Sequence, residues 1–168
     1  MPPRLVLVGP PGSGKTTAAD GVAARWGVEA RDTDADIAAA AGTTIADLFV
    51  EHGEAHFREL ERAAVATALV ESDGVLALGG GAVLDADTRA LLAGHRVVFL
   101  DVGIKDAASR IGLNRDRPLL LGNPRAQWIR LMEARRSFYT EVATVTVDTD
   151  GRSPAEVVDE IVRLVPDA

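Results

Sequence analysis

The chain has 168 residues, 47% of them hydrophobic, which is the size and composition of one domain with a single core. No apolar run approaches the roughly 18 residues needed to cross a bilayer, and glycine and proline interrupt the short apolar stretch near the N-terminus, so neither a membrane span nor a signal sequence is expected. A net charge of −7 disfavours a nucleic-acid partner, and the lack of cysteine excludes disulfides and thiolate metal sites, which fits a cytoplasmic protein.

Apolar strand patterns and helical patterns alternate along the chain. Strands are expected within residues 4–9, 28–34, 74–83, 95–102 and 142–149. Helices are expected within residues 16–27, 43–53, 54–72, 106–111, 125–138 and 153–165. Thr44 and Ser153 stand at predicted helix N-caps, and Gly27 at a predicted helix end. This alternation predicts an α/β fold, a parallel sheet with helices on both faces, in which ligands gather beyond the carboxyl ends of the strands.

The stretch "GPPGSGKT", residues 9–16, fits the phosphate-loop pattern G-x-x-x-x-G-K-[ST] and lies between a predicted strand and a predicted helix. Its glycines let backbone N–H groups surround phosphate oxygens, and the helix N-terminus adds partial positive charge. Lys15 is expected to reach the β- and γ-phosphates, and the Thr16 hydroxyl to join the coordination of Mg²⁺. We therefore predict that ATP is bound by Gly12, Ser13, Gly14, Lys15, Thr16 and Thr17.

Two carboxylates follow the second predicted strand. Asp32 and Asp34 are two residues apart, so on an extended segment both side chains project toward the same cleft. In that arrangement one carboxylate supports magnesium and the other holds an acceptor hydroxyl. The alternative is that this acidic turn caps a helix, and Asp36 is expected to be a cap or a surface residue.

Three further features each have two interpretations. Arg58 shares a predicted helix face with Glu54 and Glu61, which either form surface ion pairs or orient its guanidinium toward a carboxylate. The glycines at 79–81 form either a plain loop or a segment whose backbone a ligand approaches closely. Residues 105–136 contain eight basic and three acidic side chains, which indicates either a solvated helix face or a site for a small anion.

Taken together, these motifs resemble the shikimate kinases. The similarity runs nearly end to end, through "GPPGSGKT", "DTD", "GEAHFRELE", "LGGGAV", "RPLL" and "RRSFY". The resemblance implies a three-layer P-loop NTPase fold with a five-stranded parallel sheet, in one domain over residues 1–168. It implies transfer of the γ-phosphoryl of ATP to the 3-hydroxyl of shikimate, in the route to chorismate and the aromatic amino acids. It also implies Mg²⁺ as cofactor, ATP and shikimate as substrates, and a cytoplasmic monomer.

The resemblance assigns roles to the matching positions. Asp34 would bind the acceptor hydroxyl, as a base or only as a positioning group, and Asp32 would support magnesium together with Thr16. Arg110 and Arg152 match positions near the adenine and phosphates. The positions matching the acceptor pocket, most of them in a segment over about 32–61, are Arg58, Phe49, Phe57, Glu61, Gly80, Gly81 and Arg135. Composition alone instead favours the hydrophobic core for the two phenylalanines.

Two basic segments need separate treatment. Arg117 in "RPLL" matches a catalytic and ATP-binding arginine on a lid over about 112–124, whereas the neighbouring Arg115 has no assigned role. In the late motif the family has an arginine four residues before a tyrosine, and Tyr139 therefore selects Arg135 over Arg136, which is expected to lie on the helix surface. "SFY" stands where the family often has a proline, so the local backbone is expected to differ.

Two rival functions remain. A related small-molecule kinase, such as a gluconate kinase, would share the phosphate loop and the sheet. A nucleotide-binding regulatory module would need neither Asp34 nor Arg58.

Overall fold

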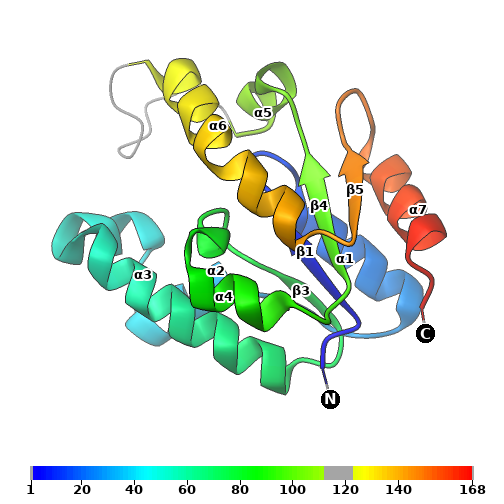
Figure 1. Ribbon diagram of the computed structural model, residues 1–168, viewed down its shortest axis with the longest axis horizontal. Coiled ribbons are helices and arrows are strands. Elements are labelled where there is room, and N and C mark those ends of the chain that lie inside the picture. The colour runs from blue at the N-terminus through cyan, green and yellow to red at the C-terminus, as the bar shows by residue number, and fades with distance from the viewer. Residues whose placement is uncertain (1, 112–122, 168) are drawn as a thin grey trace.

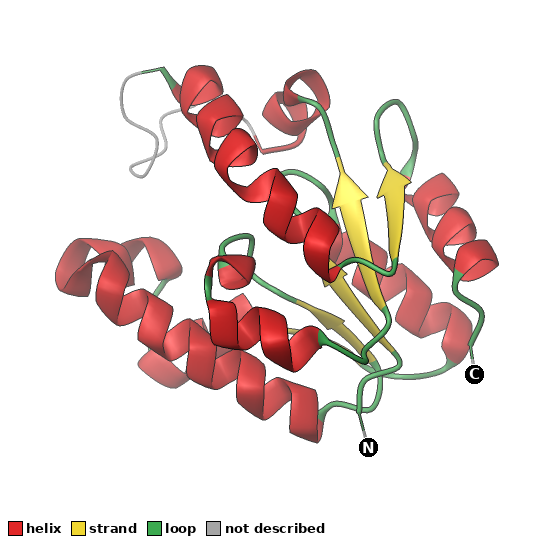
Figure 2. Ribbon diagram, viewed as in Figure 1, coloured by secondary structure: helices red, strands yellow, loops and turns green. Residues whose placement is uncertain are grey.

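The computed structural model describes residues 2–111 and 123–167. Its strands, yellow in Figure 2, form one parallel sheet. The order of the strands is β2-β3-β1-β4-β5. The strands are β1 (Leu5–Val8), β2 (Ala30–Asp32), β3 (Val75–Ala77), β4 (Val97–Asp101) and β5 (Val145–Asp148). In the central strand β1, Leu7 pairs with Ala77 of β3 on one side and with Val98 of β4 on the other. The predicted five-stranded parallel sheet is confirmed.

Helices cover both faces of the sheet, so the molecule has three layers (Figure 1). One face carries α1 (Lys15–Trp26) and α7 (Pro154–Leu164), and the other carries α3 (Ile45–Glu71), α4 (Ala86–Leu92), α5 (Ile104–Ile111) and α6 (Pro124–Val142). The alternation of side chains along β1 divides its residues between the two cores, with Val6 and Val8 facing α3 and α6 and with Leu5 and Leu7 facing α1 and α7.

Local sequence explains how several of these helices begin and end. Ser153 accepts from the backbone N–H of Glu156 at 3.2 Å, and Glu156 accepts from that of Ser153 at 3.1 Å, which completes a capping box. Thr44 caps α3 in the predicted way. The two helices expected over 43–72 form one element with a kink at Gly53, where φ is 81°.

Two helices were not predicted, α2 (Thr33–Ala41) and α4. The sequence of α2 is rich in alanine and lacks a helical apolar stripe, whereas α4 is only 7 residues long. The side chains that bury α2 come from α3, because Ile37 packs with Leu48 and Phe57 in a small core of their own. Tertiary contacts therefore supply what the local pattern lacks.

The segments predicted to bind ligands lie at one edge of the sheet, at the carboxyl ends of the strands. The phosphate loop follows β1, Asp32 ends β2, and residues 79–81 follow β3. Within the described ranges, the helices are all too short or too polar to traverse a lipid bilayer.

Candidate active site

The loop between β1 and α1 has a backbone that other residues would not fit. Gly12 and Gly14 have φ values of 84° and 85°. A Cβ on Gly9 would lie 2.6 Å from the carbonyl oxygen of Leu100. The loop is therefore pressed against β4, and its backbone can curl around a ligand.

Lys15 is folded back on this loop. Its Nζ donates to the carbonyl oxygens of Gly9 at 2.8 Å and Pro10 at 3.2 Å. Burial lowers the pKa of Lys15 to about 8, against the opposing effect of the nearby Asp34 and Asp32 carboxylates. A phosphate placed beside this amine would favour its charged form, as expected of a group that binds anions.

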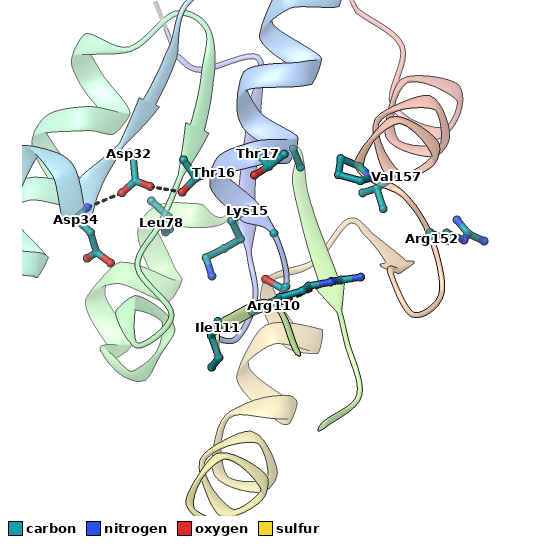
Figure 3. Close-up of a pocket in the computed structure, with 15 residues that line it drawn as sticks. Lys15, Thr16, Thr17, Asp32, Asp34, Leu78, Arg110, Ile111, Arg152 and Val157 are labelled. Atoms are coloured by element: carbon teal, nitrogen blue, oxygen red, sulfur yellow. Dashed lines mark hydrogen bonds between the residues drawn. The ribbon is translucent and has the colours of Figure 1, made fainter. Parts of the chain in front are cut away.

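A pocket of about 520 Å³ opens beside the loop (Figure 3). It is lined by all the residues predicted to bind ATP that lie in the described ranges, namely Gly12, Ser13, Gly14, Lys15, Thr16, Thr17, Arg110 and Arg152, and by Asp32 and Asp34. Arg110 is held in place because its guanidinium donates to the carbonyl oxygens of Gly12 at 3.2 Å and Thr149 at 2.7 Å. Arg152 is exposed and lies apart from the loop, at the β5–α7 side of the opening.

Asp32 caps a helix, as one of the two alternatives predicted, and its second oxygen is bonded to the phosphate loop. Its Oδ1 caps α2 by accepting from the backbone N–H of Asp34 at 2.8 Å, and its Oδ2 accepts from Thr16 Oγ1 at 2.8 Å. Figure 3 shows both bonds. The expected extended segment through both aspartates is wrong, because β2 ends at Asp32 and Asp34 lies in the first turn of α2. The helix turn nevertheless brings both carboxylates to one pocket.

Asp34 has the most perturbed carboxylate environment of the pocket. Its Oδ1 is buried with no hydrogen-bond partner among the described residues. Burial, with the neighbouring Asp32 and Glu61 carboxylates, raises the pKa of Asp34 to about 6, although Lys15 and Arg58 act in the opposite direction. An unpartnered oxygen on a carboxylate of this pKa is suited to accept the proton or hydrogen bond of a hydroxyl group.

The glycines at 79–81 make room for side chains. A Cβ on Gly79 would lie 2.5 Å from Asp34 Oδ1, and one on Gly81 would lie 2.2 Å from the guanidinium of Arg58. A Cβ on Gly80 would lie 3.4 Å from Arg135 Nη1. Gly79 and Gly81 thus each let one charged group approach the end of β3, which a plain loop would not require.

Arg58 lies between acidic and aromatic neighbours on α3. Glu61, whose side chain is only 4% exposed, accepts from Arg58 Nη1 at 2.8 Å. The rings of Phe49 and Phe57 lie 4.7 Å apart, and the Arg58 Cζ is 6.0 Å and 5.4 Å from their centroids. Burial raises the pKa of Glu61, against the hydrogen bond from Arg58. Arg58 is therefore oriented by a buried partner, while Phe57 belongs to the small core beneath it.

The two adjacent arginines of the late motif point to different places. Arg136 forms a bidentate pair with Asp101 at the end of β4, with Nη1 and Nη2 at 2.8 Å and 3.2 Å from the carboxylate. Arg135 lies beside Gly80 and interacts with the charges of Lys15 and Glu61. Arg136 thus lies on the helix surface, as expected, and also joins α6 to the end of β4.

Comparison with known protein families shows which family this chain belongs to. The family model described as shikimate kinase matches residues 11–166 of the chain. The chain belongs to the shikimate kinase family. The predicted family is therefore confirmed by a match that includes most of the phosphate loop, the glycine segment and α6.

Individual relatives are similar over most of their length. A shikimate kinase of Frankia casuarinae is 63% identical over 155 residues, which cover 92% of this chain and 69% of the relative. A shikimate kinase of Streptomyces avermitilis is 62% identical over 159 residues, covering 95% and 93%. The solved structure of a shikimate kinase from Acinetobacter baumannii in complex with shikimate has a TM-score of 0.91 at 33% identity, covering 98% of this chain and 93% of that one. A gluconokinase from Sinorhizobium meliloti, at a TM-score of 0.61 and 23% identity, shares the fold.

Part of the predicted site falls outside the described residues. These residues are Arg115, Arg117 and most of the segment predicted as a lid over about 112–124. The end of that segment is described, and there Asn123 caps α6 by accepting from the backbone N–H of Ala126 at 3.1 Å.

Sequence reasoning predicted no site contact for two residues, Tyr139, which served only to select Arg135, and Trp128. Tyr139, fully buried and stacked on Phe99 at 5.0 Å, donates its hydroxyl to the Gly80 carbonyl oxygen at 2.6 Å. Trp128 donates its indole N–H to the Pro11 carbonyl oxygen at 2.9 Å. Their spacing of eleven residues places both on one face of α6, and that periodicity was the available signal.

Proposed function

We propose that this chain transfers the γ-phosphoryl group of ATP to the 3-hydroxyl of shikimate, giving shikimate 3-phosphate and ADP. The observation that carries this proposal is the unpartnered Oδ1 of Asp34, buried in the pocket that the phosphate loop also lines. A module that only binds nucleotide has no use for a carboxylate of raised pKa beside its phosphate loop.

The acceptor side supplies orientation. Asp34 accepts the hydrogen bond of the attacking hydroxyl, and its pKa of about 6 leaves it mainly ionised at neutral pH. Arg58, oriented by Glu61, and Arg135, beside Gly80, supply two guanidinium groups for the carboxylate of shikimate. Gly80 and Gly81, which follow β3, would approach the ring through their backbone N–H groups. Phosphoryl transfer depends mainly on such alignment of the acceptor with the donor.

The donor side supplies positive charge. Lys15 would leave the carbonyls of Gly9 and Pro10 to contact the β- and γ-phosphates. Thr16 and Asp32, joined at 2.8 Å, offer one hydroxyl and one carboxylate oxygen, a donor set that suits Mg²⁺ bound mostly through phosphates and water. When bound, Mg²⁺ neutralises charge on the phosphate oxygens. Arg110 and Arg152 would bind the nucleotide, and Arg117 would contact it from the predicted lid.

One assay separates this function from its rivals. Release of ADP is measured by enzymatic coupling with shikimate, with gluconate and with no acceptor. We expect release that requires shikimate, and expect Lys15→Ala to abolish it. Release that gluconate stimulates more strongly would favour a sugar-acid kinase, and tight MgADP binding without turnover on either acceptor would favour a regulatory module.

The adjacent arginines provide a matched pair of variants. Arg135→Ala is expected to raise the KM for shikimate by at least about tenfold, since a charge-assisted pair to a carboxylate contributes about 1.5–3 kcal/mol. Arg136→Ala removes the pair with Asp101 instead and is expected to leave that KM within about twofold. Equal effects of the two substitutions would contradict the assignment of Arg135.

We also propose that the active unit is a cytoplasmic monomer. The support is that one chain provides the phosphate loop, both aspartates and the arginines of the acceptor side. Sedimentation equilibrium at assay concentration, followed through a dilution series of specific activity, tests the monomer. Activity per chain that falls on dilution would contradict it.

A further inference from the structure

The phosphate loop contains a tight turn whose type depends on one peptide unit. The N–H of Ser13 donates to the carbonyl oxygen of Pro10 at 3.2 Å, which closes a turn with Pro11 and Gly12 at its centre. The φ of Gly12 is 84°, the value required at the third position of a type II turn. Types I and II differ by a flip of the central peptide, here the one between Pro11 and Gly12.

Trp128 of α6 holds that central peptide from outside the loop. Its indole N–H donates to the Pro11 carbonyl oxygen at 2.9 Å, and the side chain is only 4% exposed. The indole is therefore anchored in the core between α6 and the sheet, together with Met132 and Tyr139 on the same helix face. A buried donor of this kind fixes the direction of the carbonyl that it bonds.

The direction of this carbonyl determines the direction of the next amide. No peptide bond in the described ranges is cis, so the Pro11 carbonyl and the Gly12 N–H point in opposite directions within the plane of their peptide. Because the carbonyl faces Trp128, the Gly12 N–H faces away from α6. Gly12 lines the nucleotide pocket, so a flipped peptide would turn a carbonyl oxygen instead of an N–H toward the loop interior.

The turn is also packed too tightly for other residues. A Cβ on Gly12 would lie 3.0 Å from the backbone of Ala107 in α5 and from its carbonyl oxygen. Arg110 of the same helix donates to the Gly12 carbonyl oxygen at 3.2 Å. Two helices thus hold the two peptide carbonyls around Gly12, α6 through Trp128 and α5 through Arg110.

We propose that Trp128 is a positioning residue for nucleotide binding: its indole N–H locks the phosphate loop in the type II turn that presents the Gly12 N–H to a polyphosphate. The inference rests on the proposed function, since it assumes that the loop binds ATP. It makes the affinity for nucleotide depend on a side chain of α6 that lies behind the loop.

The second tryptophan of the chain provides a matched control. The Nε1 of Trp26 is buried without a hydrogen-bond partner among the described residues, so Trp26→Phe removes an indole N–H that bonds nothing there. The chain contains 2 tryptophans, and Trp26→Phe therefore leaves Trp128 as the single indole. In that background, growth with β-(3-benzothienyl)alanine replaces the Trp128 N–H by sulfur and keeps the ring shape, whereas Trp128→Phe also removes volume.

The measurement is the Kd for MgADP and, separately, for shikimate, by titration calorimetry. Loss of the Trp128 N–H is expected to weaken MgADP binding about five- to tenfold in the benzothienyl chain, and tenfold corresponds to about 1.4 kcal/mol. The Kd for shikimate should stay within about twofold, and Trp26→Phe alone should change neither. Trp128→Phe should weaken MgADP binding at least as much.

Two results would overturn the inference. The first is that the benzothienyl chain binds MgADP with a Kd within twofold of that of the Trp26→Phe chain, while Lys15→Ala abolishes MgADP binding. The other is an equal loss of affinity for MgADP and shikimate, which a general loosening of α6 would cause. Failure of the proposed function looks different, because the parent chain would then release no ADP in response to shikimate.

Discussion

Replacing Asp34 by asparagine should stabilise the fold while it removes activity. The carboxyl of Asp34 has a pKa of about 6 in the folded chain, against an ordinary value of 3.8, because it is buried beside Asp32 and Glu61. Below pH 3.8 it is protonated in both the folded and the unfolded chain and contributes nothing. Between pH 3.8 and 6 the unfolded chain releases the proton first, so folding becomes less favourable, and above pH 6 the full cost applies.

The size of this effect follows from the two pKa values. Their difference corresponds to about 3 kcal/mol at neutral pH, at about 1.4 kcal/mol for each pH unit. Asparagine lacks the negative charge that favours the first turn of α2, which offsets about 0.3–1 kcal/mol of the gain. A net stabilisation of about 2 kcal/mol should raise the melting temperature by about 4–8 °C in a domain of this size. Loss of the hydroxyl acceptor should reduce turnover about 10²- to 10⁴-fold.

Thermal melting at pH 7.5 and pH 4.5, paired with the ADP-release assay, tests the prediction. The gain in melting temperature should be present at pH 7.5 and small at pH 4.5, where the carboxyl of Asp34 is largely protonated when folded. Asp36→Asn is the control on the same helix, because Asp36 accepts from Arg31 at 2.7 Å and its loss should not stabilise the chain. The reasoning is refuted if Asp34→Asn melts at or below the parent temperature at pH 7.5, or if its gain is equally large at both pH values.

Three further outcomes follow from the site. Gly79→Ala should lower turnover about 10²-fold, because its Cβ would lie only 2.5 Å from Asp34 Oδ1 and would displace that oxygen. The Kd for MgADP should stay unchanged, and a change in that Kd would contradict the contact. Tyr139→Phe should raise the KM for shikimate about three- to tenfold, with little change in the KM for ATP, because Gly80 loses the hydrogen bond to its carbonyl. In the parent, kcat/KM for shikimate should fall below about pH 6 as Asp34 is protonated, and a flat profile from pH 5 to 8 would exclude it as the titrating group.

The fold was predictable because the strands of this chain are short apolar runs separated by clear helix signals. The strand patterns located all five strands, and parallel connection placed the phosphate loop, Asp32 and the glycine segment at one edge. The capping pattern at Ser153 was also readable, since it depends on four neighbouring residues. By contrast, α2 has no apolar periodicity, so its packing against α3 could not be predicted from the local pattern.

The residues of the candidate site could be predicted from the sequence, but their arrangement in space was harder to predict. Asp32 and Asp34 do share a pocket, but through a helix N-cap in place of an extended strand. The bonds from Tyr139 to Gly80 and from Trp128 to Pro11 join residues 59 and 117 positions apart. Each ends on a backbone carbonyl, which every residue possesses, so the acceptors carry no signature in the sequence.

Burial disfavours the charged forms of several groups in this site, and bound ligands would reduce that cost. Burial acts against the charge of Lys15, Asp34 and Glu61 alike, and the glycines at 79–81 allow the acids and Arg58 to crowd at the end of β3. A triphosphate beside Lys15 would favour its ammonium form, and an acceptor hydroxyl would give Asp34 Oδ1 the hydrogen bond that it lacks. Lys15 and Asp34, whose burial makes folding less favourable, are thus the groups that gain from the two substrates, so substrate binding should stabilise the folded chain.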